Sequence, residues 1–474
     1  MDSIVGSPRK ALWSATLGFF VGFAAVALFG PSANRFQQVM GLGPLALGFL
    51  VAVPSLSGSL LRIPFSAWVD TTGGRKPFLW LLNLAVIGMI GLALVARFLY
   101  PTHLSYKSYP LLMVLGTLSG CGIATFSVGI SQVSYWFPQR KQGRALAIFA
   151  GIGNVAPGIF LMLVPFALSR FGLAVSYLLW LCILATGTIL YALLGKNSPY
   201  FQLLKKGLAP TEARVRAHEL GQDLFPTGNL KDSLRISARV WRTWALVWIY
   251  FTTFGGFMAL TAWLPIYWTR FFGVSVEHAL MLAAVFSIVA SLIRVAGGVL
   301  SDQLHEGGEN TAILALFITL VGALVMTSSR QFELSVPGEI LMAFGMGICN
   351  AAVFKIVPQA VPKAVGGAAG WVGGFGAFGG FVIPPIMGFA VRNLGQNGYA
   401  IGFITFIFLA LFSLSMAWIL KYAREEISPH DSSARSNEGP VAREPDAIFR
   451  VDRGAMGTLS VEGPASPDIY RKVK

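Results

Sequence analysis

Apolar runs long enough to cross a bilayer follow one another along most of this chain. A spanning helix needs about 20 apolar residues, because a hydrocarbon core of about 30 Å offers its backbone no outside hydrogen-bond partner. Hydrophobic residues make up 55% of the sequence and charged residues only 12%. The sequence therefore predicts an all-α membrane protein with twelve transmembrane helices, at roughly 11–30, 45–69, 78–100, 110–135, 143–168, 172–195, 243–269, 279–300, 310–328, 336–359, 367–391 and 398–421.

Composition divides the chain into four parts. Residues 1–195 and 243–421 hold six apolar runs each, and the polar segment 196–242 between them is predicted to be a cytoplasmic linker with one short surface helix near 210–220. Residues 422–474 have few apolar side chains, so we expect a disordered cytoplasmic tail. Lys and Arg gather on one set of alternate connections, which places both termini in the cytoplasm and explains the net charge of +15 without a nucleic-acid partner.

Arg62 lies inside one of the apolar runs. Asp70 and the turn at 73–76 mark where that helix ends, so Arg62 is about 12 Å inside it at 1.5 Å per residue. A membrane-embedded arginine costs at least ~2.5 kcal/mol and by default marks a functional site. A buried ion pair is the alternative explanation, but all 21 Asp and Glu residues are predicted in loops, tails or helix ends. We therefore expect Arg62 to bind an anion.

The same pattern occurs a second time at a constant offset of 232 residues. Four residues of the first copy have counterparts in the second: Ser55, Ser59, Arg62 and Asp70 correspond to Ser287, Ser291, Arg294 and Asp302. Positions i−7, i−3 and i share one helix face, so each copy carries a Ser-Ser-Arg stripe followed by an acid. Two arginines at matching depth predict one anion site at the interface of two pseudo-symmetric halves.

Several motifs resemble those of the nitrate/nitrite porter family of the major facilitator superfamily. Ser66-x3-Asp70-x2-Gly73-x-Arg75-Lys76 resembles the superfamily's loop motif, which implies gating roles for Asp70, Arg75 and, in an imperfect second copy, Asp302. FAGIGNVAPGIF at 149–160 and GWVGGFGAFGGFVIPP at 370–385 are similar to the family's two glycine-rich nitrate signatures. Close helix packing without substrate contact is the alternative explanation for these glycines. The resemblance covers residues 11–421 and implies the major facilitator fold of two six-helix halves.

The resemblance also implies a set of substrate-binding residues. In it the arginines hold the anion, the phenylalanines press on it, and the tyrosine and asparagine hydrogen-bond it; the set is Arg62, Arg294, Tyr250, Asn154, Phe126, Phe354, Gly153, Gly373 and Gly376. Nitrate and nitrite are small, planar and monovalent, which suits a guanidinium fork between aromatic walls. Further candidates are Ser59, Ser291 and Lys355, the last of which is equally well explained as a snorkelling side chain.

These features predict a secondary transporter of nitrate and nitrite that works by alternating access, mainly by exchange. Exchange is favoured over proton coupling because no protonatable side chain is expected inside a span and arginine does not release its proton. Closing an empty site would also bury two unpaired charges, so closure should need a bound anion. The alternatives are nitrate/proton symport, a carrier for another small anion such as oxalate/formate, and a sensor that binds without transport.

We expect a monomer in the cytoplasmic membrane, with no cofactor or metal. An enzyme is not expected, because no His lies in a span and no nucleophile–base set occurs.

Overall fold

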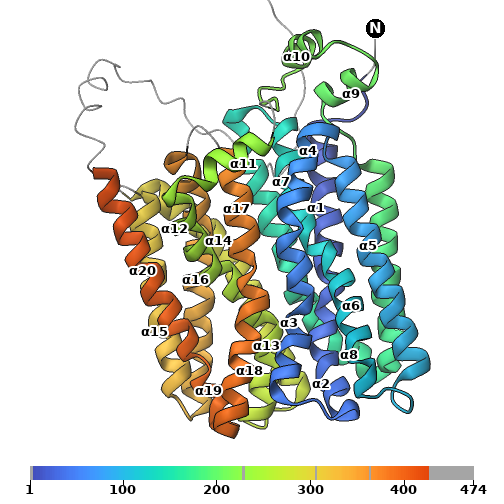
Figure 1. The fold of residues 1–474 in the computed structure, drawn as a ribbon, viewed down its shortest axis with the longest axis vertical. Coiled ribbons are helices and arrows are strands. Elements are labelled where there is room, and N and C mark those ends of the chain that lie inside the picture. The colour runs from blue at the N-terminus through green and yellow to red at the C-terminus, as the bar shows by residue number, and fades with distance from the viewer. Residues whose placement is uncertain (1–3, 227–229, 305–306, 362–364, 426–474) are drawn as a thin grey trace, which may run out of the picture. The chain divides into compact units, whose positions relative to one another are not determined.

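Helices form the whole framework of the computed structural model, which describes residues 4–226, 230–304, 307–361 and 365–425. No strand occurs among these residues. Figure 1 shows most of the helices running side by side, with the blue and green helices of the first half beside the yellow and red helices of the second. Contacts group Met1–Glu425 into one compact unit. The predicted tail lies outside the described residues, apart from its first few.

The first half contains eight α-helical segments. They are α1 (Pro8–Ala24), α2 (Phe29–Met40), α3 (Pro44–Leu60), α4 (Arg62–Thr72), α5 (Arg75–Leu94), α6 (Tyr109–Gly120), α7 (Thr125–Trp136) and α8 (Gln139–Leu194). Short 3-10 segments join α1 to α2 and α6 to α7, so each of these pairs makes one long span. The first span runs over Pro8–Met40 and is longer than the predicted 11–30.

Helix α8 contains two of the predicted spans. Its backbone turns at Gly172, where φ is 72° and ψ is 178°, a conformation that glycine adopts without a Cβ clash. The described residues contain eleven candidate membrane-spanning stretches, and one of them, Ile148–Leu194, includes this turn. Division at Gly172 gives twelve spans, as the sequence predicts.

The second half contains nine α-helical segments. They are α12 (Trp241–Tyr250), α13 (Gly256–Phe271), α14 (Val276–Gln303), α15 (Gly307–Ser328), α16 (Phe332–Ala360), α17 (Val365–Ala377), α18 (Gly379–Leu394), α19 (Gly398–Ile401) and α20 (Ile404–Glu425). A π-helical turn, η5 (Phe251–Gly255), joins α12 to α13. Such turns are rare and occur often at functional sites, so η5 is a natural place to look for ligand contacts.

The segment between the halves has more structure than the sequence suggests. It contains α9 (Pro199–Lys205) and α11 (Leu230–Ala238) in addition to the expected α10 (Pro210–Glu219). Prolines at the first turn of α9 and α10 preset the helical φ angle. A small core of its own packs α9 against α10: Tyr200, Phe201, Leu203, Ala213 and Ala217. These helices are too short for a clear hydrophobic period, which explains why two were missed.

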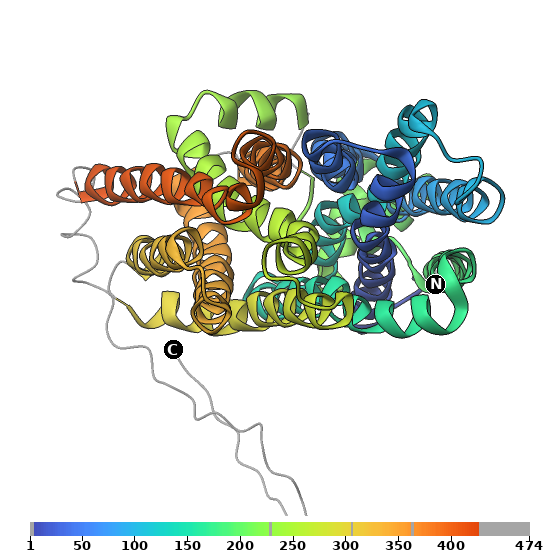
Figure 2. The same cartoon turned by 90° about the horizontal axis from the view of Figure 1, so that it is seen from below.

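Two helix pairs bring the halves together. Helix α3 packs along α18, and α14 packs along α8. The sequence repeat relates α3 and α4 to α14, so these two contacts are counterparts of each other. Figure 2 shows the same helices from below, with the first-half and second-half groups adjacent. Residues on α3, α8, α14 and α18 therefore line the interface at which the site was predicted, whereas the domain boundaries at 195, 242 and 421 remain predictions.

Two buried acidic residues, Glu309 and Glu339, lie inside candidate spans of the described part of the chain, contrary to the sequence prediction. Glu339 is 2% exposed in α16, and Glu309 is 3% exposed near the start of α15. Helix α16 begins at Phe332, about one turn before the predicted start at 336, so Glu339 is two turns inside it. Its Oε2 accepts a hydrogen bond from Trp268 Nε1 at 2.6 Å, which partly offsets the cost of burial. The prediction that no protonatable side chain lies within a span is therefore wrong.

Candidate anion site

Arg62 is completely buried at the junction of α3 and α4. Its Nε donates to Gly58 O of the same span at 2.9 Å, and its Nη1 donates to Gly373 O of α17 at 3.2 Å. Its Cζ lies 4.9 Å from the ring centroid of Phe126 and 4.9 Å from that of Phe254. Among the described residues, its Nη2 has no hydrogen-bond partner. Burying a charged donor without a partner is costly, so an anion is the natural ligand for this group.

Arg294 lies half-buried on α14, and its Cζ is 5.9 Å from the ring centroid of Phe354 on α16. Tyr250 connects the surroundings of the two arginines. Its ring stacks on Phe254 at 4.9 Å with an interplanar angle of 3°, and it meets Phe354 edge-on at 5.1 Å. Tyr250 and Arg294 both lie near enough to Arg62 to interact with it electrostatically.

Tyr250 also has an unused polar group. The residue is completely buried, and its Oη has no hydrogen-bond partner in the described part of the chain. A neutral hydroxyl can donate one hydrogen bond, which makes it a suitable partner for an oxyanion. The predicted pair of arginines and Tyr250 are thus brought together around one aromatic cluster.

Asn154 and Ser291 meet where α8 contacts α14, whereas Ser59 lies on α3. Asn154 is 2% exposed; its Nδ2 donates to Ala150 O at 2.7 Å, and its Oδ1 has no partner among the described residues. Ser291 Oγ lies 2.8 Å from the backbone carbonyl oxygen of Asn154 across the two halves and 2.7 Å from Ser287 O, so its single proton is shared between these two acceptors. Ser59 Oγ donates to the carbonyl four residues earlier in α3 at 2.6 Å. The hydroxyl protons of Ser59 and Ser291 are thus engaged by backbone, which favours a packing role.

The predicted glycines make room for aromatic rings. A Cβ on Gly153 would clash with the ring of Phe19, and a Cβ on Gly376 would lie 2.6 Å from the ring of Tyr250. At Gly373 the nearest side-chain atom would be 3.7 Å away, so this position is not crowded. Its carbonyl instead accepts the hydrogen bond from the buried arginine of α4. Two glycines therefore position the aromatic cluster, and the third contributes a backbone acceptor.

The predicted gating residues of the first half lie at the corner between α4 and α5. Asp70 Oδ1 accepts a hydrogen bond from Tyr135 Oη at 2.5 Å. Burial raises the pKa of the Asp70 carboxyl, and the hydrogen bond from Tyr135 opposes this rise. Arg75 Nη2 donates to Ala192 O at 2.7 Å, and the Arg75 backbone N–H donates to Asn197 Oδ1 at 2.9 Å.

Two further predicted residues, Lys355 and Asp302, belong to the second half. Lys355 Nζ donates to the carbonyl of Ser301, near the end of α14. Ser301 is seven residues, or about 10 Å of helix rise, beyond Arg294, so this contact turns Nζ toward the helix end. Asp302 belongs to α14, but its side chain lies outside the described part of the structure.

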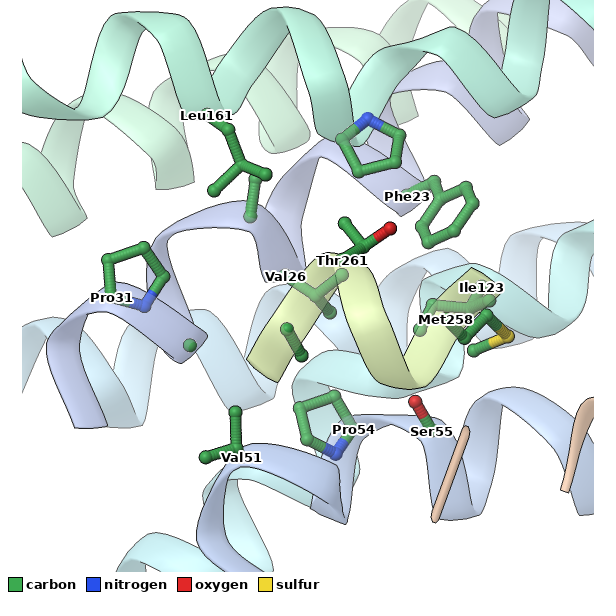
Figure 3. Close-up of a pocket in the computed structure, with 14 residues that line it drawn as sticks. Phe23, Val26, Pro31, Val51, Pro54, Ser55, Ile123, Leu161, Met258 and Thr261 are labelled. Carbon is green, nitrogen blue, oxygen red and sulfur yellow. The ribbon is translucent and has the colours of Figure 1, made fainter. Parts of the chain in front are cut away.

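A small cavity of about 50 Å³ opens between the halves, next to Ser55 (Figure 3). Its wall is mostly apolar, with side chains such as Phe23, Val51 and Met258, and Figure 3 shows hydroxyl groups only on Ser55 and Thr261 among the labelled residues. No charged side chain lines it. The cavity therefore lacks the groups to neutralise an anion, and the cluster around Arg62 and Arg294 remains the candidate anion site.

The sequence interpretation missed Phe254, which contacts the guanidinium as closely as Phe126 does. It also missed Phe19, whose ring lies 5.3 Å from Phe126 and covers Gly153. One signal was available: Phe254 follows Tyr250 by four residues, so the two share a helix face. Phe19 had no comparable signal among the 36 phenylalanines.

Comparison with known proteins finds one superfamily profile and several relatives named for nitrate or nitrite transport. The Major Facilitator Superfamily profile matches residues 15–336. The probable nitrate/nitrite antiporter NarK1 of Thermus thermophilus is 31% identical over 88% of this chain and 93% of its own length. The probable nitrate transporter NarT of Staphylococcus epidermidis is 28% identical over 84% of this chain and 92% of its own length. The nitrite extrusion protein of Bacillus subtilis is 27% identical over 88% of this chain and 95% of its own length.

Solved structures share the fold. The xylose transporter XylE from E. coli aligns with a TM-score of 0.63 at 15% identity, covering 86% of this chain and 98% of its own. The superfamily match, the relatives and the multiple apolar spans point to a multi-pass membrane transporter of the major facilitator class. The chain belongs to the nitrate/nitrite porter family of that superfamily.

Proposed function

We propose that this protein is a secondary transporter that exchanges nitrate and nitrite across the cytoplasmic membrane by alternating access. The observation that carries the proposal is the completely buried Arg62, whose Nη2 has no hydrogen-bond partner among the described residues. Relatives whose names specify nitrate or nitrite, such as the probable nitrate/nitrite antiporter NarK1 and the nitrite extrusion protein, support this choice of anions.

The site chemistry suits a planar monovalent oxyanion. Arg62 Nη2 and Tyr250 Oη offer donors from opposite halves, and Arg294 adds a second positive charge from the second half. Phe126 and Phe254 flank the Arg62 guanidinium and shield it from water, which strengthens its attraction for a bound anion. An aromatic enclosure with few donors fits a weakly hydrated anion better than a divalent one.

The arrangement also favours exchange. Among the described residues, no acidic side chain forms an ion pair with Arg62 or Arg294. An empty site would therefore close around unpaired positive charge, which is costly in a low-dielectric interior. The hydrogen bond from Arg62 to Gly373 O crosses the halves and has to break when they part at this level. Return through the closed state is thus expected to need a bound anion.

Topology and domain roles complete the proposal. We place both termini in the cytoplasm, because Lys and Arg gather on that set of connections. Residues 1–195 and 243–421 act as the rocking halves, and 196–242 joins them on the cytoplasmic side. A monomer is sufficient, because the site is built within one chain.

Nitrate/proton symport is a second candidate, favoured by the buried Glu339. Its Oε2 accepts from Trp268, and its Oε1 has no hydrogen-bond partner in the described residues. A protonatable acid inside a span is the usual mark of proton coupling. Glu339 is fifteen residues, or about 22 Å of helix rise, from Phe354, so it would act on the anion site indirectly.

The deciding experiment uses purified protein in liposomes. Uptake of ¹⁵N-nitrate is measured with internal nitrite, with internal chloride, and with internal chloride plus an inward proton gradient. Exchange predicts rapid uptake only with internal nitrite. Accumulation driven by the proton gradient alone would establish symport instead. No nitrate movement in any condition would refute nitrate transport, and uptake of labelled oxalate or formate into the same liposomes would then identify another small anion.

A further inference from the structure

A second concave site, separate from the arginine cluster, lies where α5 begins. It has a volume of about 620 Å³, and its lining includes Arg75, Lys76 and Lys205 together with Asn197, Leu79 and Trp80. Three of its lining residues carry positive charge and none is acidic. The site therefore has the electrostatic character of an anion-binding pocket, and neither Arg62 nor Arg294 lines it.

Hydrogen bonds fix the residues at the back of this pocket, around the corner between α4 and α5. Gly73 adopts a φ of 77°, and a Cβ there would clash with Asn197, so the tight corner between α4 and α5 depends on glycine. Asn197 Nδ2 donates to Thr72 O at 3.0 Å, and its Oδ1 accepts from the Arg75 backbone at 2.9 Å. Arg75 Nη2 donates to Ala192 O, while its buried Nε has no partner among the described residues. One cation is thus held in place before any ligand arrives.

The outer wall changes from basic to apolar along α5. Lys76 and Lys205 are exposed, and Lys76 Nζ lies 5.4 Å from the ring centroid of Trp68. One turn further into the span, Trp80 is 53% exposed beside the half-buried Leu79. Tryptophan favours the interface between headgroups and hydrocarbon, so the change from basic to apolar side chains near Trp80 marks the membrane surface. A soluble anion would use only the basic part of such a pocket.

We propose that this pocket binds an anionic phospholipid. The lipid phosphate is held by Arg75, Lys76 and Lys205, and the glycerol and upper acyl chains lie along Leu79 and Trp80. Basic pockets beside spanning helices recognise anionic headgroups in this way. The bound lipid would brace the corner between α4 and α5, next to the gating residue Asp70.

Thermal unfolding in detergent tests the proposal. Purified protein is titrated with dioctanoyl phosphatidylglycerol, dioctanoyl phosphatidylcholine or inorganic phosphate. We expect a saturable rise in melting temperature with phosphatidylglycerol only. In the double variant Lys76→Gln/Lys205→Gln, the apparent affinity for phosphatidylglycerol should fall roughly 30-fold, the ratio expected for losing two lysines at a lipid surface. The control Arg97→Gln/Lys107→Gln removes the same charge from exposed residues outside the pocket and should behave like the unmodified chain.

Two results would overturn the proposal. Equal stabilisation by inorganic phosphate would make the pocket a site for soluble anions, and unchanged phosphatidylglycerol affinity in the double variant would remove the pocket from lipid binding. Both readouts are independent of nitrate exchange, so they remain informative even if the transport proposal fails.

Discussion

The guanidinium carbon of Arg62 lies 4.9 Å from the ring centroid of Phe254, and the two residues belong to opposite halves of the transporter. Phe254 lies in the π-helical turn η5 and stacks on Tyr250, which meets Phe354 beside Arg294. A continuous row of rings therefore connects the two arginines. A shift of the second half would move the aromatic surface against which Arg62 lies, so the proposed anion binding and the proposed rocking of the halves would be mechanically linked.

Replacing Arg62 with lysine should abolish transport. Lysine keeps the positive charge but loses the planar fork that bonds Gly58 O and Gly373 O while leaving Nη2 for the anion. We expect nitrate uptake to fall at least about 100-fold, the effect of losing a buried charge-assisted hydrogen bond worth about 3 kcal/mol. Arg330→Lys, on the periphery, is the matched control. Uptake within a few-fold of the unmodified protein would contradict an arginine-based site.

Phe254→Leu should weaken nitrate binding while leaving the protein folded. The leucine fills much of the space but removes the ring that Arg62 and Tyr250 contact. A cation–π contact in a desolvated site contributes about 1–2 kcal/mol, so roughly a tenfold rise in the dissociation constant is expected. Phe257→Leu is the control, because Phe257 packs on Phe254 and Phe286. Binding is measured calorimetrically, and equal losses in both variants would show a general packing effect.

Gly153→Ala should be much more damaging than Gly151→Ala. A Cβ at position 153 would clash with the Phe19 ring, whereas one at position 151 would meet nothing within 4 Å. Overpacking of this kind costs about 1–3 kcal/mol, because the ring has to move away from Phe126. Melting temperature and nitrate exchange should both fall in the first variant and stay near normal in the second. Equal behaviour of the two would mean that the glycine signature has no steric role at position 153.

Asp70 should make stability depend on pH. Burial raises its pKa above the ordinary value of 3.8, so the folded protein binds the proton more tightly than the unfolded chain. This contribution is fully present below pH 3.8 and is lost as pH rises through the raised pKa of the folded state. Asp70→Asn removes the ionisation but keeps an acceptor for Tyr135. The variant should therefore melt higher than the unmodified protein at pH 7.5, with the gap closing on acidification; a gap independent of pH would exclude this titration.

The sequence was most informative where one residue type is rare. An arginine in an apolar run stands out, and its repetition 232 residues later identified both arginines of the candidate site. Aromatic residues carry less information, because they make up 13% of the chain and most serve packing. Phe254 reaches the guanidinium through a π-helical turn that hydropathy does not register. Glu339 was misplaced because an error of one turn in a helix start moves an acid from the membrane surface to the interior.

Glu339→Gln distinguishes exchange from proton symport. The amide keeps the size of the side chain and an acceptor for Trp268 Nε1, but it cannot carry a proton. The nearby groups that could compensate are Tyr267, whose hydroxyl interacts with Glu339, and Arg330. If exchange is the main mode, nitrate/nitrite counterflow in Glu339→Gln liposomes should match the unmodified protein between pH 6 and 8. Glu333→Gln, on the exposed first turn of the same helix, is the matched control. The contradicting result is nitrate-coupled proton uptake that occurs in the unmodified protein and in Glu333→Gln but not in Glu339→Gln. It would reject exchange and identify Glu339 as the proton carrier of a symporter.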